Sequence, residues 1–75
     1  MTPTTKATIM HALAGASVNA SNDLYLVKCQ FERLGVSEMD REYADTGMTC
    51  RQVLARAQLR ADNVAAAIKK IEAIP

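Results

Sequence analysis

Apolar side chains recur at intervals of three and four residues through the first half of the chain. Such spacing places them on one face of an α-helix, because a helix turns once in about 3.6 residues. The positions are Ile9, Leu13, Ala16, Ala20, Leu24, Val27, Phe31 and Leu34. We predict helix over residues 5–34, and Gly35 has the conformational freedom to end it in the left-handed region. Ser21, Asn22 and Asp23 are typical N-cap residues, so the pattern allows either one bent helix or two helices.

A second apolar stripe begins after Thr49. The segment Thr49–Gln52 has the pattern of a capping box, in which the first and fourth residues bond each other's backbone N–H. Apolar positions then follow with the 3-4-3-4-3 spacing that is typical of a coiled-coil seam. They are Leu54, Ala57, Ala61, Val64, Ile68 and Ile71. No Gly or Pro interrupts this pattern before Pro75, so we predict a long helix over residues 50–73 with the last three of these positions buried.

Residues 35–48 connect the two stripes. Ser37 and Asp40 have the spacing of a capping box with Asp in place of Glu, which predicts a short helical turn over residues 38–45 that ends at Gly47. If this connector reverses the chain, the helices run antiparallel, and in four successive layers a small residue of one faces a large residue of the other, as a dense core requires. The opposed pairs are then Phe31/Leu54, Val27/Ala57, Leu24/Ala61, Ala20/Val64, Ala16/Ile68 and Leu13/Ile71.

These patterns predict an all-α fold. The expected architecture is a single small domain of residues 1–75, an antiparallel helical hairpin with a long C-terminal helix and a short connecting helical turn. A chain of 75 residues buries only about 60% of its unfolded surface. Several apolar side chains also lack a partner in the hairpin: Val18, Leu26, Met39, Val53, Leu59 and Ile74. We therefore expect a homodimer; in the alternative, the connecting turn and a separate first helix cover these residues.

Charge and composition exclude several classes of protein. Nine Lys/Arg against eight Asp/Glu leave a net charge of +1, whereas a dedicated nucleic-acid binder is strongly basic. No apolar run reaches the ~20 residues that span a bilayer. We expect a soluble cytoplasmic protein without a membrane partner, in which Cys29 and Cys50 are free thiols. Two thiols and His11 fall short of the about four ligands that a structural zinc ion takes.

No pattern of residues suited to catalysis is present. Catalysis needs a titratable group beside a reacting atom, or a nucleophile beside a base. His11 is the only histidine and follows Met10 in an apolar segment. The motifs of phosphate loops, dinucleotide sites, zinc proteases and serine hydrolases are absent. We expect a protein that is not an enzyme and uses no cofactor, no metal ion and no small-molecule substrate.

Residues 49–71 resemble a helix-turn-helix, the DNA-reading unit of many small bacterial and phage regulators. The apolar positions of that motif are occupied by Val53, Ala57, Leu59, Val64 and Ala67. Two positions depart from it, because Gln58 stands where the turn usually has Gly, and Leu54 where the first helix usually has a small residue. The resemblance implies a DNA-binding transcriptional regulator in which Leu59 is buried in the turn. A continuous helix would leave Leu59 exposed.

The charges are unevenly distributed along the chain. Residues 49–75 carry five Lys/Arg against two Asp/Glu, a net charge of +3, and residues 22–46 carry three against six, a net charge of −3. Acidic residues in the connector complement the dipole of a helix start. One face of the C-terminal helix, outside the seam, holds the candidate partner-binding residues Arg56, Arg60, Asn63 and Lys70.

We expect a small non-enzymatic helical binding module that acts through protein–protein interaction, as an adaptor or as an inhibitor of a larger complex. An amphipathic helix ordinarily has a polar face that only contacts solvent. The assignment of this face to partner binding therefore rests on the alignment of its cations over several turns. The alternative is a helix-turn-helix DNA-binding transcriptional regulator, in which the same face lies on the duplex.

Overall fold

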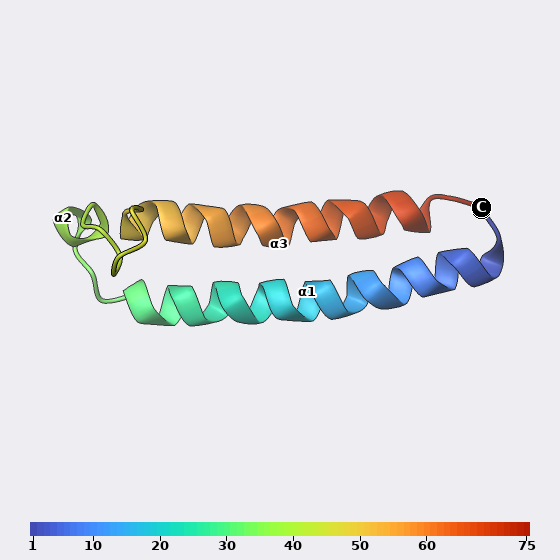
Figure 1. The fold of residues 1–75 in the computed structure, drawn as a ribbon, viewed down its shortest axis with the longest axis horizontal. Helices are drawn as coiled ribbons and strands as arrows, with labels where there is room; N and C mark the ends of the chain where they lie inside the picture. Colours follow the sequence, from blue (N-terminus) through green and yellow to red (C-terminus); the bar gives the residue numbers. More distant parts are fainter.

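The computed structural model describes residues 1–75 and contains three helices: α1 (Pro3–Phe31), α2 (Val36–Met39) and α3 (Cys50–Glu72). α1 and α3 lie side by side and run in opposite directions (Figure 1). α2 and the following turn lie at one end of this pair, and both chain ends lie at the other (Figure 1). No strand is present beyond an isolated bridge between Glu42 and Thr49. The predicted all-α fold is confirmed.

α1 is one continuous helix of 29 residues, so Ser21, Asn22 and Asp23 do not begin a second helix. Thr2 caps its start, because the Thr2 hydroxyl oxygen accepts the N–H of Thr5 at 3.2 Å. Pro3 follows in the first turn. Backbone N–H groups in this turn make no hydrogen bond within the helix, so the absence of an N–H in Pro costs nothing there. None of the helices has the apolar length that crossing a bilayer requires.

The connector differs from the prediction. α2 has four residues and starts after Gly35, whose backbone is extended (φ −75°) rather than left-handed. The N–H of Gly35 donates to the Glu38 carboxylate at 3.4 Å. The turn expected over residues 38–45 is therefore displaced toward the N-terminus, because Glu38 supplies the capping carboxylate. The left-handed residues of the connector are Ala44 (φ 50°) and Gly47 (φ 74°).

α3 is one continuous helix of 23 residues. Its capping box forms as predicted: Thr49 Oγ1 accepts the N–H of Gln52 at 3.1 Å, and Gln52 Oε1 accepts the N–H of Thr49 at 2.9 Å. The helix passes through residues 58–61 without a break, and Leu59 is 60% exposed. The structure therefore has no turn of the kind that a helix-turn-helix needs.

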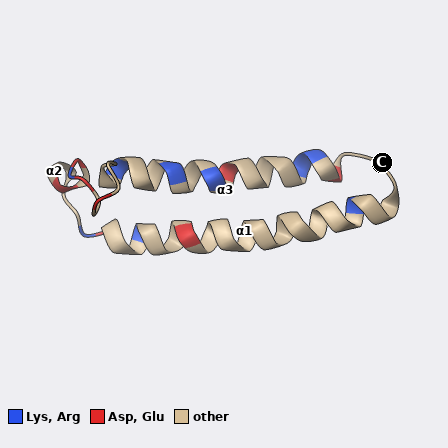
Figure 2. Cartoon of the chain, viewed as in Figure 1, with Lys and Arg blue, Asp and Glu red and all other residues tan.

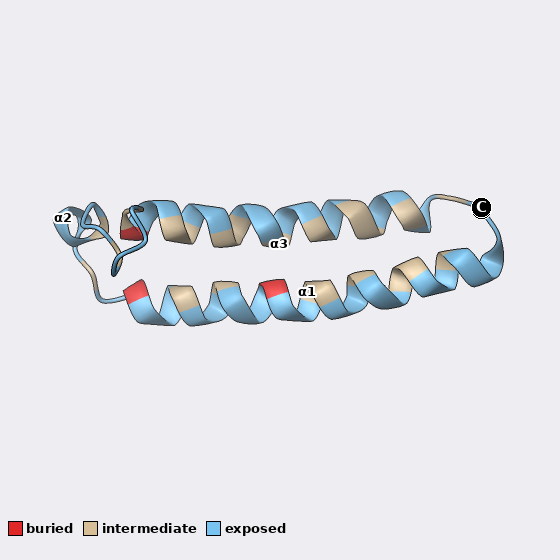
Figure 3. Cartoon of the chain, in the orientation of Figure 1, coloured by how far each residue is buried: buried red, intermediate tan, exposed pale blue.

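The core is a single seam between α1 and α3 (Figure 3). Only Ala20, Phe31 and Cys50 are buried, with 1%, 6% and 7% of their surfaces exposed. The remaining seam residues are half-buried, because each faces one helix and solvent reaches it from both flanks. Three positions that were expected to be buried are half-buried for this reason: Val64, Ile68 and Ile71.

Replacement of Phe31 by Ala is expected to lower the free energy of unfolding by about 3–4 kcal/mol, because it removes a buried ring. Ile68→Ala should cost about 1–2 kcal/mol, since a half-buried side chain gives up less transfer free energy. Leu59→Ala, at an exposed position of the same helix, is the control and should change the free energy by less than about 0.5 kcal/mol. Urea denaturation followed by circular dichroism measures all three. Equal changes in the free energy of unfolding for Ile68→Ala and Leu59→Ala would contradict the packing of Ile68 between the helices.

Candidate functional site

The four residues predicted to bind a partner all lie exposed on α3. Figure 2 shows Lys and Arg spread along this helix, while acidic residues gather at α2 and the turn that follows. The structure divides the four into two groups. Arg56 and Arg60 border a cavity between the helices. Asn63 and Lys70 lie farther along α3, outside the cavity lining, and make no side-chain hydrogen bond or ion pair within the chain.

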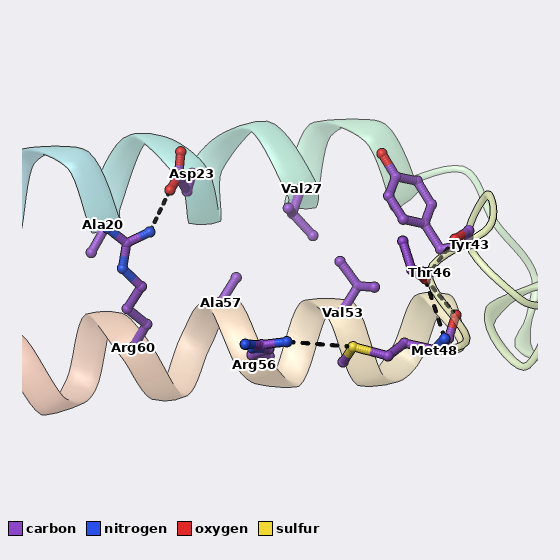
Figure 4. A pocket seen from close by; sticks show the side chains of 10 residues that line it. All are labelled: Ala20, Asp23, Val27, Tyr43, Thr46, Met48, Val53, Arg56, Ala57 and Arg60. Atoms are coloured by element: carbon purple, nitrogen blue, oxygen red, sulfur yellow. Dashed lines mark hydrogen bonds and ion pairs between the residues drawn. The ribbon is translucent and has the colours of Figure 1, made fainter.

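The cavity has a volume of about 360 Å³ and lies between α1, α3 and the turn after α2 (Figure 4). Small apolar side chains of the two helices form its floor: Ala20, Val27, Val53 and Ala57. Tyr43, Thr46 and Met48 of the turn form one end wall. Arg56 and Arg60 stand on the α3 side, and Asp23 stands on the α1 side.

Small side chains on both helices create this space. In the predicted register, Leu24/Ala61 and Ala16/Ile68 set a large residue against a small one, and Phe31/Leu54 and Leu13/Ile71 each set two large residues together. At this level Val27 lies opposite Ala57, and the neighbouring residues Ala20 and Val53 add little volume. Packed protein interiors leave few voids larger than a water molecule. The underfilled layer therefore leaves an apolar hollow on one flank of the seam.

Hydrogen bonds within the turn hold its side chains against the helices. The N–H of Tyr43 donates to the carbonyl of Met48 at 2.8 Å, and the Thr46 hydroxyl donates to the carbonyl of Tyr43 at 2.6 Å. The Tyr43 ring packs edge-to-face on Phe31, with centroids 5.3 Å apart. The Tyr43 hydroxyl also donates to Gln30 Oε1 at 3.1 Å. The end wall of the cavity is thus fixed to the end of α1.

An ion pair closes the other end of the cavity. Arg60 Nη1 lies 2.7 Å from Asp23 Oδ2, and the two side chains are 54% and 56% exposed. Pairs this exposed contribute only about 0–1 kcal/mol, because water screens them. Arg56 has no carboxylate partner in the chain, and its Nη1 lies 3.7 Å from the sulfur of Met48. A thioether is a weak acceptor, so the Arg56 guanidinium keeps most of its capacity to bind an anion.

Three of the four acidic residues of the connector, Glu38, Asp40 and Glu42, have partners within the chain. Asp40 Oδ1 lies 3.0 Å from Nε of Arg51, whose Nη2 also donates to the carbonyl of Val36 at 3.4 Å. Glu42 accepts the N–H of Gly47 at 2.9 Å. Together with the capping role of Glu38, these contacts give the carboxylates structural partners. Asp45 is the one exposed connector carboxylate without such a partner.

Other groups with reactive chemistry lie apart from the cavity. Cys29 is exposed on α1 and Cys50 is buried at the start of α3, and both are free thiols. Hydrogen bonding to Cys29 and the charge of its thiolate raise the pKa of Tyr25 above its ordinary value, with a further contribution from desolvation. No group of three or more His, Cys, Asp or Glu side chains gathers in a way that would hold a metal ion.

The sequence pattern identified the cations of this site but not the cavity beside them. In the sequence Asp23 is a potential helix cap, and it also follows the seam residue Ala20 by about one helical turn. Tyr43 and Met48 were missed because nothing in the connector sequence fixes how it folds back. The usable signal is the Val27/Ala57 pair, which with Ala20/Val64 is one of two layers of the predicted register that contain no Leu, Ile or Phe.

The contact between Asp23 and Arg60 is expected to be weakly stabilising. A double-mutant cycle with Asp23→Asn and Arg60→Gln should give a coupling free energy of about 0.5 kcal/mol at low salt. Raising the salt to about 1 M should reduce it toward zero, because exposed charges are then screened within a few ångströms. Thermal denaturation of the four proteins measures the coupling. A salt-independent coupling free energy above about 2 kcal/mol would contradict a weak, exposed ion pair between Asp23 and Arg60.

Comparison of the chain with known protein families, with curated proteins and with solved structures finds no match. Functional inference for this chain therefore rests on the geometry of the cavity and its cationic border.

Proposed function

We propose that the chain is a small non-enzymatic binding module that acts through protein–protein interaction, as an adaptor or as an inhibitor of a larger complex. The observation that carries the proposal is the position of Arg56. Its guanidinium is exposed, lacks a carboxylate partner and stands beside an apolar cavity. Protein interfaces combine apolar pockets with Arg more often than other surfaces do.

The charge distribution favours a protein partner over DNA. Non-specific DNA binding grows with the number of phosphates that Lys and Arg neutralise. Two of the five α3 cations, Arg51 and Arg60, already pair with carboxylates of the chain. The continuous course of α3 also removes the turn on which the resemblance to DNA-binding regulators rested. A DNA-binding regulator remains the alternative that the experiment below distinguishes.

Reversal of the charges that border the cavity should abolish partner binding. The variant Arg56→Glu, Arg60→Glu is compared with Lys28→Glu, Arg33→Glu, which makes the same change in net charge at exposed positions of α1 and its C-terminal end. Quantitative affinity capture from the source cells should recover one defined protein with the parent chain and with the control. Recovery with the cavity variant should fall at least about tenfold, a loss equivalent to one close charge contact.

Two results would contradict this proposal. In one, the cavity variant recovers the same protein as efficiently as the parent chain. In the other, the parent chain binds duplex DNA of any sequence at ~50 mM salt and loses affinity steeply as salt rises. The second result would support the DNA-binding alternative. Circular dichroism of each variant confirms that the helices are retained.

We also propose that the chain forms a homodimer. It exposes 5535 Å², whereas a compact monomer of 8.1 kDa exposes roughly 4500 Å². The excess of about 1000 Å² is similar to the ~800 Å² that each partner buries in a standard interface. Val18 and Tyr25 are each more than half exposed and lie two helical turns apart on α1. They provide an apolar face outside the cavity for a second copy.

Sedimentation equilibrium should give a mass near twice 8.1 kDa at concentrations above about 10 μM, where an interface of moderate affinity is populated. Val18→Asp, Tyr25→Asp should return the chain to a monomer, because a buried unpaired carboxylate is costly. Val36→Asp introduces the same group at an exposed apolar residue of α2 and should leave the mass unchanged. A parent chain that stays monomeric at millimolar concentration would exclude the homodimer.

A further inference from the structure

The cavity has the chemistry of a receptor for one aliphatic side chain. Its floor consists of methyl-bearing side chains, and no charged group lies on that floor. Water in such a place has few polar partners, so its replacement by an apolar group is favourable. Met48 adds an adaptable thioether at one end, since Met side chains reshape easily around what they contact.

The size of the cavity limits the occupant. A volume of about 360 Å³ is at the lower end of the ~300–1,000 Å³ of small-molecule sites. The Asp23–Arg60 pair bounds one end and the Tyr43–Thr46 wall bounds the other. An occupant therefore reaches the floor from the open flank beside Arg56. One Leu, Ile or Met side chain fits this route.

The border of the cavity selects for carboxylates. Arg56 has no carboxylate of its own, and Arg60 holds Asp23 in an exposed pair that an incoming carboxylate can replace. The guanidinium fork binds carboxylate through two parallel hydrogen bonds. An amphipathic helix presents an apolar side chain and an acidic one on the same face when they are three or four residues apart. Arg56 lines the same cavity as the floor residue Ala57, so the two contacts lie close together.

We infer that the cavity receives an aliphatic side chain from an acidic amphipathic helix of the protein partner, with a carboxylate one turn away on Arg56. This inference rests on the proposed function and names the kind of partner that the site accepts. The charge pattern of the chain itself supports an external occupant, since three of its four connector carboxylates are held by Arg51, Gly35 and Gly47.

Three synthetic peptides test the recognition with the unaltered chain. Each is about 18 residues long, because shorter isolated helices are marginal. The first has a central Leu with Glu on the same face in the adjacent turns. The second has Ala in place of the Leu, and the third has Gln in place of each Glu. Fluorescence anisotropy measures affinity, and amide chemical shifts of the labelled chain show where each peptide binds.

The first peptide should shift the amides of Val27, Val53 and Ala57. Loss of the Leu should weaken binding by about tenfold or more, which corresponds to one buried aliphatic side chain. Loss of the Glu residues should weaken it several-fold and remove most of its salt dependence. Absence of binding by the first peptide, or equal binding by all three, would overturn the inference. Shifts confined to Val18 and Tyr25 would place the peptide on the other apolar face and would also overturn it.

A filled cavity provides the matched variant. Ala57→Leu places extra methyl groups in the hollow and should weaken binding of the first peptide by at least about tenfold; circular dichroism shows whether the helices are retained. Ala55→Leu makes the same substitution two residues away at an exposed site and should bind like the parent chain. If Ala57→Leu binds as tightly as Ala55→Leu, the cavity does not receive the side chain.

The two proposals fail in different ways. If Arg56→Glu, Arg60→Glu loses the cellular partner while Ala57→Leu retains both the partner and the peptide, the basic border binds the partner and the cavity inference is wrong. If the charge variant keeps the partner, the proposed function itself is wrong at this surface. The peptide comparison uses the unaltered chain, so its result stands even if Ala57→Leu does not fold.

Discussion

The packing of α1 against α3 is one side chain deep, and the other features of the molecule depend on this seam. Each seam residue has a helix in front of it and solvent on both flanks, which is why only three residues are buried. The chain is accordingly elongated, about 50 × 20 × 15 Å. A layer this thin has no second layer to compensate for an imperfect fit. Any layer with small residues on both helices opens directly to solvent.

The cavity is the local consequence of that constraint. Most layers of the seam contain a Leu, Ile or Phe, but Val27 and Ala57 leave space between the helices. In a thicker domain, side chains from a third element would fill such a space. Here the turn after α2 covers one end only, since Tyr43 rests on Phe31. Ala57 therefore permits close approach of the helices and also creates an apolar recess beside Arg56 and Arg60.

Local and periodic signals predicted the two long helices well. The seam positions follow from spacing alone, and the Thr49–Gln52 cap needs no contact beyond four residues. The connector was predicted poorly because its structure depends on distant partners, such as Gln30 for Tyr43 and Arg51 for Asp40. The cavity was not predicted because it arises from side-chain volumes across the helix pair. Arg56 and Arg60 were identified from their position on the helix, but their difference in pairing depends on Asp23, a residue of the other helix.

The two thiols differ sharply in their surroundings. Cys29 is on the outer surface of α1, whereas Cys50 is covered at the first turn of α3, where only 7% of its surface is exposed. A thiol reacts as the thiolate and only where a reagent can reach it. Cys29 is therefore open to alkylation or oxidation in the folded chain, while Cys50 reacts only when the first turn of α3 separates from its neighbours. The reactivity of Cys50 thus reports opening at the same end of the seam that forms the wall of the cavity.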